Sequence, residues 1–171
     1  LAYIGPQLQA TYAWRVERAA KATPAQIQAR HQEYHQVAAV LPMLQQAGVT
    51  IMAGTDAGFL NSFNYPGIGL HDELSLFVKE GLTPAQALSA ATRAGPAWFG
   101  TLDRYGAVAP GKAADLVLLE RNPLEDIEAT RSIQYVVLRG QGYDRKALDA
   151  LLEQTKAKVA ACKAEGAKPT P

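Results

Sequence analysis

The most informative part of the hydrophobic pattern is the segment from Gly48 to Gly58, which reads GVTIMAGTDAG. Its apolar and β-branched residues do not alternate with charged ones, which predicts a short strand buried on both faces, as in a parallel sheet. Asp56 follows the end of that strand, where α/β proteins place their functional groups. Gly54 allows the backbone to turn and to approach a ligand closely. The alternative is that Asp56 only caps a turn, because Asp-Ala-Gly is also a common turn sequence.

Apolar residues recur at helical spacing before this segment, over residues 24–47. The helix is expected to begin after the capping-box sequence Thr23-Pro24-Ala25-Gln26. Pro42 should kink it near its last turns, because proline lacks a backbone donor. His31 and His35 lie four residues apart on it and could share a face, but they do not form the His-Glu-x-x-His pattern of zinc proteases. We therefore interpret them as helix surface rather than as metal ligands.

A helix is also predicted over residues 70–80, with Gly81 as its end. Asp72 and Glu73 would lie in its first turn, where negative charge interacts favourably with the helix dipole. His71 begins this helix, close in sequence to the end of the predicted strand. Its side chain could contact substrate or support the site, and it could equally be a capping or solvent-facing residue.

The segment between this strand and this helix, residues 59–69, is predicted to be an irregular loop because it contains three glycine or proline residues. It combines aromatic and amide side chains at the functional end of the strand, which favours a pocket wall over a plain connection. Asn61, Asn64 and Tyr65 are therefore candidate substrate-binding residues. The loop carries no charged residue that would indicate an acidic or basic substrate.

A second capping box, Thr83-Pro84-Ala85-Gln86, predicts a helix that runs to about Arg93. Gly95-Pro96 is expected to end it. Trp98 and Phe99 follow and are predicted to be core residues.

The pattern changes near residue 105. Two strands are predicted at 113–119 and 133–138, without an intervening helix of the kind that connects parallel strands. Residues 139–142, Arg-Gly-Gln-Gly, are interpreted as a turn. The chain is expected to be helical again from Asp144, and the residues from 164 to 171 are expected to form a disordered tail.

Composition excludes few functions. The chain has 171 residues, which is enough for one ordinary core, and its net charge of +1 indicates no nucleic-acid or anionic-membrane partner. No apolar run is long enough to span a bilayer. The single cysteine, Cys162, excludes an internal disulfide and is predicted to be a small buried hydrophobic residue of the last helix. The chain begins with leucine, so the sequence leaves the compartment open between cytoplasmic and periplasmic or secreted.

Three stretches together resemble the C-terminal portion of a metal-dependent amidohydrolase, in the branch that contains imidazolonepropionase-like enzymes and related prolidases. Residues 47–58 are similar to the last barrel strand of that family. Leu70-His71-Asp72-Glu73-Leu74 and residues 80–92, EGLTPAQALSAAT, resemble the two helices that follow it. Residues 106–117, GAVAPGKAADLV, with Asn122-Pro123-Leu124 resemble the return into its small β-sandwich.

The resemblance implies an α/β fold: the C-terminal part of a (β/α)8 barrel of the TIM type over residues 1–105, strands of a composite β-sandwich over 106–143, and a C-terminal helix with a flexible tail over 144–171. It implies hydrolysis of amide or cyclic-amide C–N bonds by metal-activated water, with zinc as the expected metal. Asp56 would then be metal ligand and proton shuttle. A small molecule or short peptide is the expected substrate.

The chain departs from the family pattern in its histidines. The family's His-x-His pair, its bridging lysine and the histidines of its middle strands have no counterparts, because only His31, His35 and His71 are present. A metal site needs three or more protein ligands. We therefore expect a piece of a longer enzyme, inactive by itself, that pairs with a missing N-terminal half or with a second copy. The alternative is a non-catalytic scaffold or interaction module that has kept the barrel geometry without the metal site.

Overall fold

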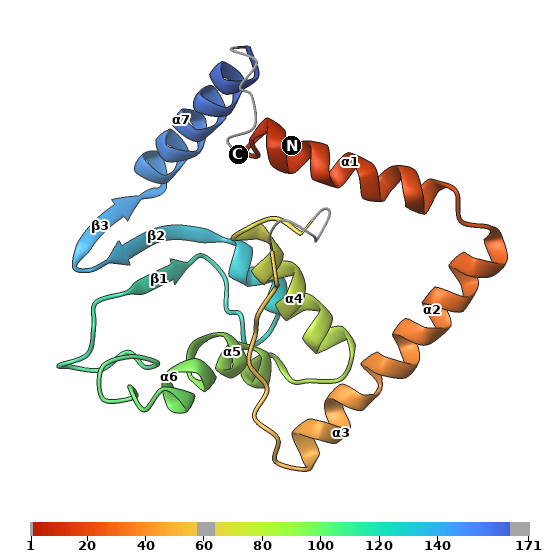
Figure 1. The fold of residues 1–171 in the computed structure, drawn as a ribbon. Coiled ribbons are helices and arrows are strands. Elements are labelled where there is room, and N and C mark those ends of the chain that lie inside the picture. Colours follow the sequence, from red (N-terminus) through yellow and green to blue (C-terminus); the bar gives the residue numbers. More distant parts are fainter. Residues whose placement is uncertain (1, 58–63, 165–171) are drawn as a thin grey trace.

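The computed structural model describes residues 2–57 and 64–164. The elements follow one another as helices α1 (Pro6–Ala20), α2 (Pro24–Ala38), α3 (Val40–Gln46), α4 (Ile68–Lys79), α5 (Pro84–Thr92) and α6 (Ala94–Trp98), strand β1 (Leu116–Leu119), the 3-10 helix η1 (Ile127–Arg131), strands β2 (Ile133–Leu138) and β3 (Gln141–Asp144), and helix α7 (Arg145–Ala164). The first three helices form an arc beside the rest of the molecule (Figure 1). In the described ranges, no helix combines the length and the apolar character that crossing a bilayer requires.

Helix α2 begins as the sequence predicts. The Thr23 hydroxyl accepts a hydrogen bond from the Gln26 backbone N–H, and the Gln26 side chain accepts one from the Thr23 N–H, which completes the capping box. The helix is also interrupted where the sequence predicts a kink, since α2 ends at Ala38 and α3 begins at Val40. Pro42 explains it, because its ring conflicts with the carbonyl of residue 38 and it offers no N–H to that carbonyl. Neither α2 nor α3 contains a buried residue.

The core lies where α4, α5 and η1 meet. Leu74 of α4, Ala87 of α5 and Ile127 of η1 are buried together, and Phe77 and Leu88 pack against them. The second capping box, at Thr83, starts α5 as predicted. The helix ends at Thr92, but Gly95-Pro96 does not stop helical structure, because both residues belong to α6.

The strands form one antiparallel sheet in the order β1-β2-β3. The two predicted strands are present, the first shortened to β1. Residues 141 and 142, interpreted as part of a turn, instead begin β3. Arg139 and Gly140 alone make the hairpin, and both have positive φ, at 52° and 79°, which is the backbone that a tight hairpin turn requires.

The predicted buried strand at residues 48–53 is wrong for this structure. These residues are in neither helix nor strand, and the side chains of Val49 and Met52 are each 45% exposed. The segment is tied to α5 by the hydrogen bond from the Ala53 N–H to the Ala90 carbonyl (3.1 Å). A buried strand needs backbone partners on neighbouring strands, and the described residues pair no strand with this segment. The parallel barrel is therefore not seen, and the described fold is a set of helices with a small antiparallel sheet.

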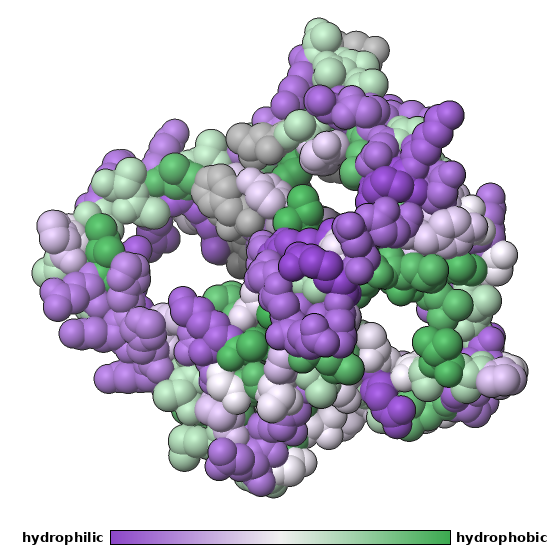
Figure 2. Space-filling model, turned by 180° about the vertical axis from the view of Figure 1, so that it is seen from behind, coloured by the Kyte–Doolittle hydropathy of each residue, from purple (hydrophilic) through white to green (hydrophobic). Residues whose placement is uncertain are grey.

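Three further predictions of burial are wrong. Trp98 and Phe99 are 73% and 76% exposed rather than core residues. Cys162 is exposed as well, and α7, which carries it, contains no buried residue. The helix lies beside β3 and α1 at the edge of the molecule (Figure 1). Space-filling Figure 2 shows openings through the molecule, one of them between the arc of α1, α2 and α3 and the rest of the chain.

Candidate functional site

Asp56 lies in the segment between α3 and α4, with an exposed side chain. Its φ is +48°, in the left-handed region that Asp and Asn tolerate better than most residues. The Thr55 hydroxyl accepts a hydrogen bond from the Ala57 N–H (3.3 Å), which spans Asp56 and tightens the turn. Non-glycine residues in this conformation concentrate at functional sites, because the surrounding structure has to hold them there.

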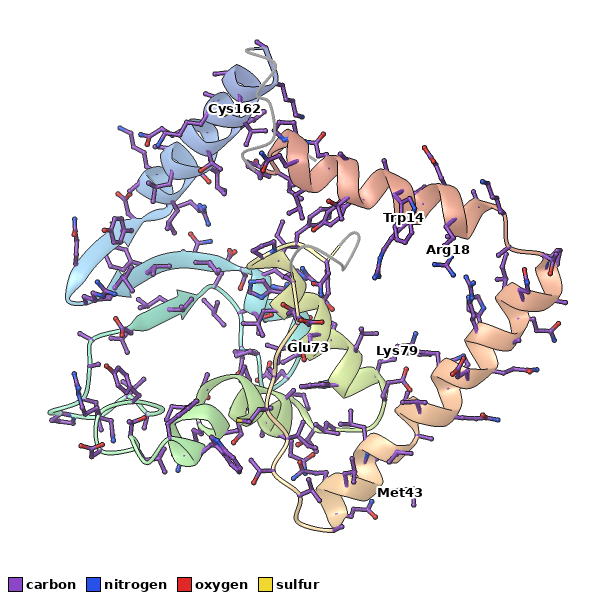
Figure 3. The ribbon with its side chains drawn as sticks, in the orientation of Figure 1. Trp14, Arg18, Met43, Glu73, Lys79 and Cys162 are labelled. Atoms are coloured by element: carbon purple, nitrogen blue, oxygen red, sulfur yellow. The ribbon has the colours of Figure 1, made fainter. Side chains whose placement is uncertain are left out.

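Glu73 of α4 holds the backbone just before Asp56. Its Oε1 accepts a hydrogen bond from the Gly54 N–H at 2.9 Å. Its Oε2 is buried and has no hydrogen-bond partner among the described residues. In Figure 3, Glu73 lies beside the trace of this segment in the middle of the molecule.

Asn64 provides a second contact to the same segment. Its side-chain amide donates to the Thr55 carbonyl, in a short contact. Its own carbonyl accepts a hydrogen bond from the hydroxyl of Tyr12, the buried aromatic residue of α1 (3.3 Å). The Tyr65 ring lies 6.0 Å from the Tyr12 ring at a tilt of 59°. Helix α1 therefore contributes to the support of the turn that carries Asp56.

A cavity of about 370 Å³ opens beside this turn. Its lining residues are Gly54, Thr55, Asn64, Gly69, Asp72, Glu73 and Leu76. Of the described candidates, Asn64 lines the cavity directly, whereas Asp56, His71 and Tyr65 are near it in sequence but outside the lining. The polar groups of the cavity are thus two carboxylates, an amide and a hydroxyl.

His71 faces η1. Its Nδ1 lies 3.0 Å from the Thr130 hydroxyl, which is buried. Burial lowers the pKa of His71, and the Arg131 guanidinium lowers it further, against smaller opposite effects of Asp72 and Glu128. His71 is therefore mostly neutral near neutral pH.

Charged and polar groups continue this contact between α4 and η1. Arg131 pairs with Asp72 (2.6 Å) and with Glu128 (2.8 Å), and the Ser75 hydroxyl donates to Glu128. The hydrogen bonds from Ser75 and Arg131 lower the pKa of Glu128. This network fixes the orientation of α4 and hence of Glu73.

His31 and His35 are exposed on α2, in agreement with the interpretation as helix surface. Within residues 2–57 and 64–164, no group of three or more His, Cys, Asp or Glu side chains is placed to hold a metal ion. Asp56 is the metal ligand that the resemblance implies in this chain, and it is not part of such a group among the described residues.

Sequence reasoning placed Asp56, Asn64, Tyr65 and His71 in the vicinity of one site, and the substrate-binding role of the last three stays a prediction. Asn61 lies outside the described residues. Glu73 was missed, because it was assigned to the helix dipole. The structure begins α4 at Ile68, so Asp72 and Glu73 lie beyond its first turn. The signal was available: Glu73 is spaced three and four residues from the inward-facing Leu70 and Phe77.

Comparisons with known proteins agree on one family. The model of the Amidohydrolase family matches residues 16–142. Ochratoxinase of Aspergillus niger is 40% identical over 85 residues, which cover 48% of this chain and 16% of that protein.

Two solved structures show the shared fold over most of the chain. A bottromycin amidohydrolase superimposes with a TM-score of 0.80 at 23% identity, over 92% of this chain and 34% of that chain. A putative prolidase from Bifidobacterium longum gives a TM-score of 0.62 at 27% identity, over 88% and 38%. The chain thus spans well under half the length of these proteins. Because the family model covers most of the sequence, the chain belongs to the Amidohydrolase family.

Proposed function

We propose that this chain is part of a metal-dependent hydrolase that cleaves amide or cyclic-amide C–N bonds, and that Asp56 is its proton-transferring residue. The single observation that carries the proposal is the conformation of Asp56 within a family match: its carboxylate is exposed and its φ is positive, directly after Gly54 and Thr55, which line a cavity. Amidohydrolases and prolidases are among the solved structures that share the fold.

The described residues fit only part of a metal centre. A carboxylate oxygen is a ligand that zinc accepts, so Asp56 can fill one coordination position. The other positions need ligands that the described residues do not provide beside it. When bound, a divalent cation supplies a water molecule whose pKa is lowered towards ~7.

Asp56 would take the proton of the attacking water on its carboxylate and return it to the leaving nitrogen. A carboxylate within reach of the reacting water can accept its proton, which is the role of a general base. Its exposure leaves it accessible to substrate. The positive φ of Asp56 sets the direction in which its Cα–Cβ bond leaves the turn.

The rest of the centre would come from a missing N-terminal half or a second copy, which would also complete the (β/α)8 barrel and the β-sandwich. Large apolar side chains on the described surface support this part of the proposal. Trp14 on α1 and Met43 on α3 are 56% and 65% exposed (Figure 3). The segment 49–53 pairs with no strand among the described residues, so adjacent barrel strands would bind its backbone there.

The substrate would be a small molecule or a short peptide. The cavity beside Asp56 has the size of a small-ligand pocket, and Asn64 supplies amide hydrogen bonds at its wall. Ochratoxinase, a relative whose name indicates activity on ochratoxin, matches this chain over only 16% of its own length. The substrate is therefore proposed only by class, as a small molecule or short peptide.

The test is Asp56→Asn in the full-length protein. Asparagine tolerates the left-handed backbone as aspartate does, so the turn is preserved while the proton acceptor is lost. We expect hydrolysis of amide substrates to fall by at least ~100-fold. Near wild-type hydrolysis by the variant would refute the role of Asp56. Absence of stoichiometric metal from the full-length protein, together with absence of hydrolysis, would instead support the non-catalytic scaffold.

A further inference from the structure

We propose that Glu73 is a positioning residue that holds the turn of Asp56 in its working conformation. The inference rests on the proposed function of Asp56. Glu73 does not touch the reacting atoms in this assignment. It acts through the backbone, by accepting the Gly54 N–H at 2.9 Å, two residues before Asp56.

The hydrogen bond is well suited to this task. Its acceptor is a carboxylate, and charge-assisted hydrogen bonds are about twice as strong as neutral ones. Its donor belongs to a segment without strand partners among the described residues, so few other bonds fix the backbone at this point. The hydrogen bond of Ala53 to α5 precedes it by one residue. The hydrogen bond between Glu73 and the Gly54 N–H thus connects the core helix α4 to the start of the turn.

The part of α4 that carries Glu73 is held in place by packing and by an ion pair. Glu73 precedes Leu74, which is buried in the core against α5 and η1. The ion pair of Arg131 with Asp72 and the hydrogen bond from the Ser75 hydroxyl to Glu128 join the same part of α4 to η1. Because α4 is packed in the core, the Glu73 carboxylate holds the Gly54 N–H at a defined place relative to the core.

Two contacts therefore hold the backbone just before Asp56. Glu73 fixes the Gly54 N–H, and Asn64 fixes the Thr55 carbonyl. The left-handed backbone of Asp56 is less favourable than an extended or helical one, so contacts to the preceding residues help to hold it. Removing one contact is expected to let the turn relax, which displaces the Asp56 carboxylate while the core remains folded.

The second oxygen of Glu73 adds support. Oε2 is buried and accepts no hydrogen bond from residues that the structure describes. Buried carboxylate oxygens are rarely left without a donor, since desolvation is costly. Its neighbourhood is the cavity beside the turn, which Glu73 lines. The carboxylate therefore has capacity for a further donor in the assembled site, and the helix dipole does not account for its place beyond the first turn of α4.

The experiment compares Glu73→Ala, Glu73→Gln and Glu80→Ala in the full-length protein, with Asp56→Asn in parallel. Glu80→Ala is a matched control, because Glu80 is the C-cap of the same helix and also accepts one hydrogen bond from a distant element, the Tyr34 hydroxyl of α2 (3.0 Å). The measurements are kcat, KM, Tm and hydrogen exchange of the Gly54 amide.

We expect Glu73→Ala to lower kcat by at least ~10-fold, the scale for groups that orient a ligand residue, with little change in KM. The Gly54 amide should exchange faster in this variant. Glu73→Gln should retain most of kcat and the protection of Gly54, because its amide oxygen can still accept the N–H. Glu80→Ala should change neither.

Unchanged kcat or unchanged Gly54 exchange in Glu73→Ala would overturn the proposal, as would a Glu73→Gln variant as impaired as Glu73→Ala. In those cases, an inactive Asp56→Asn would leave the proposed function standing, whereas an active one would overturn the function itself. If Glu73→Ala does not fold, Glu73→Met replaces it, because methionine keeps the volume without the acceptor. Failure of both to fold would show a purely structural role and contradict the proposal.

Discussion

The His71 ring nitrogen Nδ1 lies 3.0 Å from the Thr130 hydroxyl, which joins α4 to η1 across the core. His71 directly precedes Asp72 and Glu73, so this contact supports the part of α4 in which Asp72 pairs with Arg131 and Glu73 accepts the Gly54 N–H. It also makes the packing of α4 on η1 sensitive to protonation.

The first prediction concerns pH. Burial and Arg131 lower the pKa of His71 below the ordinary value of 6.5, so the folded protein binds this proton less readily than the unfolded chain. The contribution of neutral His71 to stability is therefore complete above pH 6.5 and is lost as pH falls from there through the folded pKa. Chemical denaturation of the full-length protein between about pH 5 and pH 8 measures it.

His71→Phe is the control for this prediction, because phenylalanine fills a similar volume and does not titrate. The slope of unfolding free energy against pH should be smaller in the variant across this window. Glu128 does not interfere, since its pKa is lowered from 4.5 and its contribution is lost only in a more acidic range. Equal slopes in both proteins would contradict the assignment.

The second prediction concerns Gly69, which is buried in the first turn of α4. In a helix, Gly→Ala ordinarily adds ~0.5–1 kcal/mol of stability. Here the new Cβ would overlap Asn64 Oδ1 and touch Thr55 Cγ2 at 3.5 Å, so we expect a loss of ~1–3 kcal/mol instead. Thermal unfolding measures the difference.

Two variants test the cause of that loss. Gly95→Ala in α6, where a Cβ meets no described atom within 4 Å, should not destabilise the protein. Asn64→Ala combined with Gly69→Ala should recover part of the loss, because the overlapping side chain is gone. Additive effects of the two substitutions would show that the overlap is not responsible.

The third prediction compares the two capping boxes. Thr23 and Thr83 accept the same hydrogen bond, from Gln26 N–H at 3.3 Å and from Gln86 N–H at 3.2 Å. Thr83→Ala should lower the unfolding free energy by ~1 kcal/mol, because α5 carries the buried Ala87 and Ala90. Thr23→Ala should have a smaller effect, since α2 can fray without exposing the core. An effect of Thr23→Ala as large as that of Thr83→Ala would indicate that α2 is packed against further structure in the full-length protein.

The fourth prediction concerns Cys162. Its thiol is exposed on α7, so a thiol-specific alkylating reagent should modify it in the native protein at nearly the rate seen in denaturant. Mass spectrometry of the Cys162 peptide over time checks this. Strong protection in the native state would mean that the apolar stripe of α7, with Leu151 and Leu152, is covered in the full-length protein.

Local chemistry in the sequence was enough for much of the fold. The capping boxes at Thr23 and Thr83 mark helix starts because their hydrogen bonds join residues three apart. Pro42 predicts the break between α2 and α3 because its missing N–H and its ring act on the carbonyl four residues before it, and the apolar runs of β1 and β2 predict strands. The resemblance read from residues 47–124 agrees with the family match over 16–142.

The tertiary structure decided what depends on partners distant in the chain. Residues 48–53 have the composition of a buried strand, but a strand exists only where another strand satisfies its backbone, so their pattern alone could not decide their state. Trp98, Phe99 and Cys162 are apolar by type and exposed in place, because burial depends on which surface another element covers. Glu73 shows the same principle in the site: the sequence analysis assigned it to the helix dipole, and only the folded chain brings its carboxylate to the Gly54 N–H, 19 residues away.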